Sequence, residues 1–101
     1  LVVENRAAFE CRYGTSLSSH IAGEFSGKLS NGGENIRIVD LQTGTIVDFE
    51  YDDAWYAPTD GEGSSLVLAN PLTVKADQLG LKSSWRPSAH WGGSPGAADT
   101  P

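Results

Sequence analysis

The sequence predicts an all-β domain, a β-sandwich of short antiparallel strands, with one short helix near its start. Apolar and polar side chains alternate along residues 21–25, 35–40 and 46–52, as they do in strands that bury one face. Clusters of Gly, Asn and Asp separate these stretches, and such residues accept the backbone angles of tight turns. Short strands divided by turns are typical of a sandwich.

The first elements are a strand end and a helix. Leu1–Val3 has the composition of a strand. Asn5 is a candidate N-cap for a helix over Arg6–Tyr13, and Gly14 is placed to end it. We expect Cys11 to be a small buried residue of this helix rather than a reactive thiol.

The middle of the chain carries the clearest strand pattern. After a glycine turn at residues 31–33, we expect Ile36 and Ile38 to point inward. Gly44 suits the left-handed position of the next turn. The strand that follows has two different faces. Its apolar face carries Val47, Phe49 and Tyr51, and its acidic face carries Asp48, Glu50 and Asp52.

The second half of the chain has fewer strand signals. Pro58 and the glycines after it exclude a central strand there, and Leu66–Leu68 predicts a short one. We expect residues 83–88 to be the last ordered segment and residues 97–101 to be a flexible tail. At 101 residues, the chain fits one domain over residues 1–101.

Composition and charge exclude several classes of function. The net charge is −6 and the seven basic residues are scattered, so we expect no nucleic-acid partner, because phosphate binding needs clustered Lys and Arg. No run of about 18 apolar residues occurs, so we expect no membrane insertion. The single cysteine cannot form an intrachain disulfide.

The carboxylates are candidates for chemistry. Asp48, Glu50 and Asp52 have the composition of a calcium site or of an acid and base pair, although a solvated strand face explains them more simply. If the chain binds a metal, we expect it where two loops converge, with ligands from Asp52, Asp53, Asp60 and Glu62. Calcium is the ion considered, and no other cofactor is expected.

Other residues point to binding rather than catalysis. Trp55 and Tyr56 have the composition of a sugar-stacking platform, although large aromatics in a small domain usually fill the end of its core. The candidate binding residues are Trp55, Tyr56, Asp60 and Glu62. Ser19 and His20 are adjacent, but no nucleophile-elbow pattern surrounds them. We therefore expect the protein not to be an enzyme.

The order of these signals resembles a known family. The residues that carry the resemblance are the run 25–34, Ile36, Ile38, Gly44, the run 46–51, Trp55, the run 60–68, Trp85 and the run 93–96. Together they resemble the C-terminal part of a lamin tail domain of the bacterial type. The resemblance spans about residues 1 to 97 and implies an immunoglobulin-like fold.

The chain departs from that family at its start. Lamin tail domains begin with further strands, which nothing before Leu1 supplies. We therefore expect a domain that lacks its first strands, so that exposed strand edges favour self-association or a protein partner, including a homo-oligomer.

The resemblance also implies a kind of function and a place. It implies a non-catalytic binding or structural module that mediates protein contacts or surface attachment within a larger protein. The alternative is a calcium- or carbohydrate-binding accessory module of a secreted enzyme. The implied location is outside the cell or at the surface of a bacterium, with the nucleus as the alternative.

Overall fold

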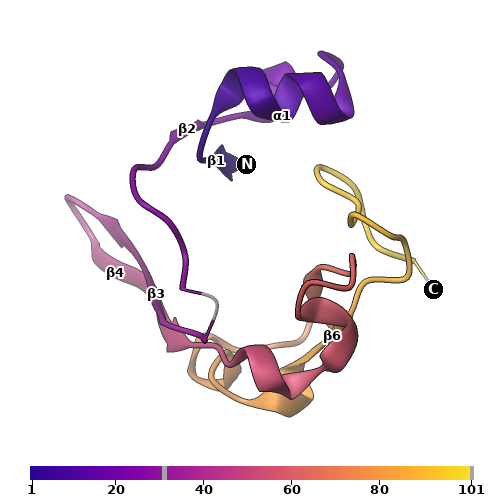
Figure 1. Cartoon of the computed structure of the whole chain (residues 1–101). Helices are drawn as coiled ribbons and strands as arrows, with labels where there is room; N and C mark the ends of the chain where they lie inside the picture. Colours follow the sequence, from indigo (N-terminus) through magenta and orange to yellow (C-terminus); the bar gives the residue numbers. More distant parts are fainter. Residues whose placement is uncertain (31, 101) are drawn as a thin grey trace. The chain divides into compact units, whose positions relative to one another are not determined.

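The computed structural model describes residues 1–30 and 32–100, and it shows a mixture of helix and strand (Figure 1). Helix and strand each account for 23% of the chain. Among the described residues, every sheet has two strands. A sandwich needs two larger sheets packed face to face, so the prediction of an all-β, immunoglobulin-like sandwich is wrong.

The chain divides into two compact units. The first consists of Leu1–Lys28 with Ser94–Ala98, and the second of Leu29–Gly93 with residues 99–100. We describe each unit separately. Of the predicted glycine turn at residues 31–33, position 31 lies outside the described residues.

The first unit contains the predicted helix. Helix α1 (Arg6–Tyr13) begins after Asn5, whose side chain accepts a hydrogen bond from the Ala8 N–H at 2.9 Å, and it ends at Gly14, where φ is +81°. The helix and both of its predicted ends are confirmed. Cys11, however, is exposed, so the prediction that it is buried is wrong. The half-buried side of α1 is formed by Phe9, Glu10 and Tyr13.

The strands of the first unit are short. β1 (Val2–Val3) pairs in parallel with β2 (Gly23–Glu24). The strand predicted over residues 21–25 is thus reduced to two residues, and a 3-10 turn, η1 (Ser18–His20), precedes it. Ile21 is the buried apolar residue of this unit among those described, at 7% exposure.

The second unit contains two antiparallel ladders. β3 (Asn35–Asp40) pairs with β4 (Gly44–Glu50), and β5 (Leu66–Leu68) pairs with β6 (Trp85–Pro87). Short 3-10 turns connect them: η2 (Asp53–Trp55), η3 (Ala57–Thr59), η4 (Ala76–Gln78) and η5 (Lys82–Ser84). The predicted strands at 35–40 and 66–68 and the left-handed Gly44 are confirmed.

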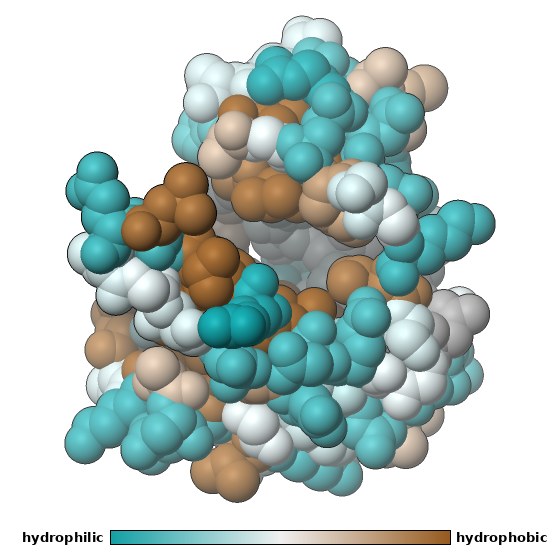
Figure 2. Space-filling model, turned by 90° about the vertical axis from the view of Figure 1, so that its left-hand side faces the viewer, coloured by the Kyte–Doolittle hydropathy of each residue, from teal (hydrophilic) through white to brown (hydrophobic). Residues whose placement is uncertain are grey.

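The core of the second unit is small. Leu79 is 8% exposed, and the Phe49 and Trp85 rings stack with centroids 5.4 Å apart. The Trp85 indole N–H donates to the Leu79 carbonyl at 2.7 Å. Many large apolar side chains are exposed, and Figure 2 shows apolar atoms at the surface. The two-stranded ladders offer too little area to cover them.

An ion pair anchors residue 99, within the segment expected to be flexible. Arg86 Nη1 lies 2.6 Å from Asp99 Oδ2, and the same oxygen accepts the Ala89 N–H at 2.9 Å. The Asp99 side chain is 6% exposed. This pair connects β6 to a residue 13 positions further along the chain.

Candidate functional site

One candidate site is an acidic pocket in the second unit. It has a volume of about 240 Å³, and its polar lining includes Tyr51, Asp52, Asp53, Thr59 and Asp60. The end of β4 and the turns η2 and η3 bring these residues together. Three of the four predicted metal ligands therefore line one pocket.

Glycine and hydrogen bonds build this pocket locally. Gly33 has φ +98°, and a Cβ there would lie 2.3 Å from the Tyr51 carbonyl oxygen, so the two backbone segments approach closely because position 33 has no side chain. The Tyr51 hydroxyl donates to the Ser30 carbonyl at 2.9 Å. Asp52 Oδ1 accepts the Ala54 N–H at 2.8 Å and caps η2.

Desolvation, together with neighbouring carboxylates, raises the pKa of two groups in the pocket. Desolvation raises the pKa of Asp53 above its usual value, and hydrogen bonding to Asp52 and the charge of Asp60 raise it further. Desolvation, followed by the charges of Glu34 and Asp53, also raises the pKa of Tyr51. The site therefore disfavours additional negative charge.

The carboxylates of this pocket are not gathered into a metal-binding group in the part of the chain that the structure describes. No group of three or more His, Cys, Asp or Glu side chains there could hold a metal ion. Glu62, the fourth predicted ligand, is exposed and is not among the residues that line the pocket. The neighbouring carboxylates of the pocket attract cations electrostatically.

The two aromatic residues of the candidate sugar platform lie outside the acidic pocket. Trp55 and Tyr56 are half-buried, and neither lines the pocket that contains Asp60. Lys82 Nζ lies 5.0 Å from the centre of the Tyr56 ring, and the Tyr56 hydroxyl donates to the Lys82 carbonyl at 3.2 Å. The ammonium group therefore lies over one face of the Tyr56 ring, in a cation–π contact.

A second candidate site is the β3–β4 hairpin, which extends from its unit in Figure 1. Its register pairs Ile38 with Val47 and Val39 with Thr45, so Ile46 is an extra, bulged residue. Ile38, Val39 and Ile46 are about half exposed, at 51%, 49% and 55%. The prediction that Ile38 points inward into a core is therefore wrong, because in the part of the chain that the structure describes its side chain stays half exposed.

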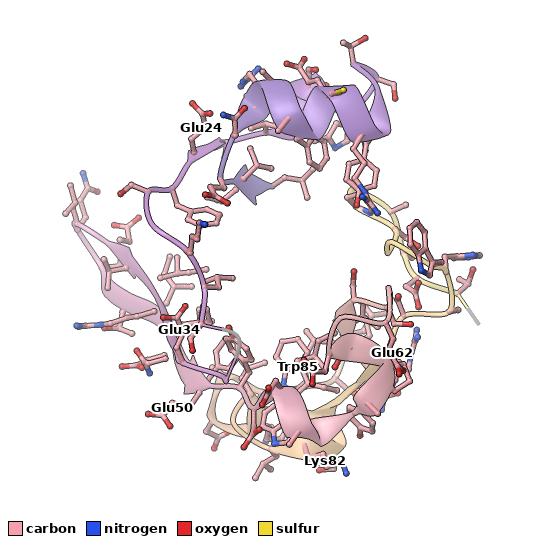
Figure 3. All side chains as sticks on the ribbon, viewed as in Figure 1. Glu24, Glu34, Glu50, Glu62, Lys82 and Trp85 are labelled. Atoms are coloured by element: carbon pink, nitrogen blue, oxygen red, sulfur yellow. The ribbon has the colours of Figure 1, made fainter. Side chains whose placement is uncertain are left out.

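The face of the hairpin that carries Arg37 and Asp48 is mainly polar, although Val39, two residues after Arg37 on β3, also lies on it. Arg37 and Asp48 are paired across the strands, with Nε and Oδ2 3.9 Å apart and both side chains at least half exposed. Asn35 Nδ2 donates to Asp48 Oδ1 at 2.7 Å. Glu50 points away from the ribbon in Figure 3. The sequence predicted the acidic residues of this face, but not that Ile38 on the opposite face would be half exposed.

Both outer edges of the hairpin lack a strand partner. Within residues 1–30 and 32–100, β3 pairs with β4 and with no third strand. The same residues contain no helix long and apolar enough to cross a bilayer. The hairpin is therefore a two-stranded ribbon with exposed apolar side chains and free backbone groups.

Comparison with known proteins does not identify the chain. No family model matches it, and neither the search of curated proteins nor the search of solved structures found a match. The lamin-tail resemblance stays a prediction. The sandwich that it implies is contradicted by the two-stranded sheets.

Proposed function

We propose that this chain is a non-catalytic binding module that contacts another protein through the β3–β4 hairpin, as part of a larger protein. The observation that carries the proposal is the combination of exposed apolar side chains and unpaired strand edges on one element. An unpaired edge is a template for another strand, and exposed apolar residues add contact area. Partner proteins use both features when a strand adds to a sheet.

Side-chain hydrogen bonds hold the turn of the hairpin. Asp40 Oδ1 accepts the N–H groups of Gln42 at 2.7 Å and Thr43 at 3.1 Å. These bonds close the turn and lower the pKa of Asp40. The edges are thus presented by a formed ladder, which reduces the entropy lost on binding.

The calcium and carbohydrate alternatives have less support. The described carboxylates form no group that could hold a metal, and the aromatic pair has Lys82 over the Tyr56 ring. Bacterial surface location and the nuclear alternative, both implied by the lamin-tail resemblance, stay predictions.

The proposal can be tested with a displayed library of random nine-residue peptides selected on the full chain. Binders should lose at least tenfold in affinity for Ile46→Lys, which places a charge on the hairpin. Leu72→Lys is the matched control, because Leu72 is 98% exposed and lies outside the hairpin. Absence of binders, or equal binding to both variants, would refute the role of the hairpin.

A further inference from the structure

The hydrogen-bonding pattern of the β3–β4 ladder shows which backbone groups of β4 face its free edge. Tyr51 N–H donates to the Glu34 carbonyl at 3.3 Å, so residues 34 and 51 form a hydrogen-bonded pair. Hydrogen-bonded and non-bonded pairs alternate along an antiparallel ladder. The pair of Asp48 with Arg37 and the pair of Glu50 with Asn35 are therefore non-bonded pairs.

The backbone groups of Asp48 and Glu50 consequently point away from β3. η4 packs against β4, yet no backbone hydrogen bond joins it to the strand among the described residues. The N–H and C=O groups of these two residues have no backbone hydrogen-bond partner among the described residues, and they form the edge that we assign to an added strand. Their carboxylates lie on the same face, and both side chains are exposed.

We propose that the partner is an extended segment that pairs antiparallel with β4 and in which apolar residues alternate with Lys or Arg. This inference about the partner rests on the proposed function of the hairpin. The basic side chains lie opposite Asp48 and Glu50, where opposite charges on neighbouring strands stabilise pairing. The apolar side chains extend the face of Val47 and Phe49. The net charge of −6 steers a basic segment toward the chain.

The same charges disfavour a second copy of this chain on the β4 edge. A twofold axis through such a pair brings Asp48 and Glu50 of both copies onto one face. Like charges on adjacent strands are destabilising, and each copy carries a net charge of −6. The occupant is therefore a basic strand of another protein.

A labelled nine-residue peptide that alternates lysine with valine and threonine tests the inference on the full chain by fluorescence anisotropy. Glu50→Gln should weaken its binding roughly two- to fivefold, as expected for one cross-strand charge pair. Glu62→Gln, the same change at an exposed position outside the hairpin, should leave binding unchanged. A peptide with glutamate in place of lysine should not bind.

Amide hydrogen exchange supplies the geometric readout. The lysine peptide should slow exchange at the amides of Asp48 and Glu50 and leave that of Arg37 unchanged, because Arg37 lies on the β3 edge. Protection at Arg37 instead, equal binding of both peptides, or dimerisation of the chain through β4 would overturn the inference. Library peptides that depend on Ile46 but lack basic residues would refute the charge pattern while leaving the proposed function intact.

Discussion

The ion pair between Arg86 and Asp99 is more enclosed than the pair between Arg37 and Asp48. Its side chains are 25% and 6% exposed, compared with 60% and 50%. The substitution Asp99→Asn preserves the shape of the side chain and removes its charge. It leaves the Arg86 guanidinium with the carbonyl oxygens of Pro87 and Asp99 as its hydrogen-bond acceptors.

The expected cost follows from this geometry. A hydrogen bond to a charged group contributes about 1.5–3 kcal/mol, and breaking a fully buried pair costs about 3–5 kcal/mol. Because Arg86 retains access to water, we expect the lower range, about 2 kcal/mol. For a chain of this size that lowers the Tm by roughly 10 °C.

Thermal and urea unfolding followed by circular dichroism measure this loss. Asp48→Asn is the matched control, because the same substitution breaks an exposed pair that contributes at most about 1 kcal/mol. High salt should reduce the effect of Asp48→Asn and leave that of Asp99→Asn largely unchanged, since enclosed charges are screened less. If Asp99→Asn costs no more than Asp48→Asn, the reasoning from burial is wrong.

Three further predictions concern the acidic pocket. The pKa of Asp53 is higher in the folded protein than its usual value of 3.8, so protonated Asp53 adds stability below pH 3.8. That contribution is lost as the pH rises through the folded pKa, where the side chain becomes charged. Asp53→Asn should therefore raise the Tm at pH 7 but not below about pH 3.8. Gly33→Ala should lower the free energy of unfolding more than Gly61→Ala does. Both glycines have a positive φ, which costs an alanine about 1 kcal/mol. Only the Cβ at position 33 would meet backbone, at 2.3 Å from the Tyr51 carbonyl oxygen, and this clash adds about 1–3 kcal/mol. Millimolar calcium should leave the Tm equal to that in chelator, since the described residues contain no metal-binding group.

Each of these has a clear contrary outcome. A Tm gain for Asp53→Asn that is the same at pH 3 and pH 7 would mean that the raised pKa of Asp53 is not its cause. Equal costs at Gly33 and Gly61 would mean that the backbone does not approach closely at Tyr51. A rise in Tm with calcium and not with magnesium would restore the carboxylates of the pocket as metal ligands.

Local signals were sufficient for several elements. Asn5 and Gly14 mark the ends of α1 because a helix cap is formed within a few residues of the chain. Asp40 and Gly44 define the hairpin turn for the same reason. The acidic residues 52, 53 and 60 were expected near converging loops, and they line one pocket.

Long-range features were not predictable in this way. Ile38 stands at a position of the alternating pattern that is typical of a buried residue. Its actual exposure depends on whether another sheet packs against that part of the hairpin. Cys11 lies on a helix whose half-buried side is formed by other residues. The bulge at Ile46 arises from the pairing of two strands, which periodicity within one strand does not reveal.

The sequence by itself determined the short helix, the hairpin and its turn, and the acidic face of β4, because caps, turn residues and period-2 alternation act over a few neighbouring positions. The tertiary structure alone decided that the ladders stay two-stranded, that Glu62 lies outside the pocket of Asp52, Asp53 and Asp60, and that Arg86 meets Asp99. These outcomes depend on which distant segments come into contact, and the free energy of such contacts is set by packing and desolvation.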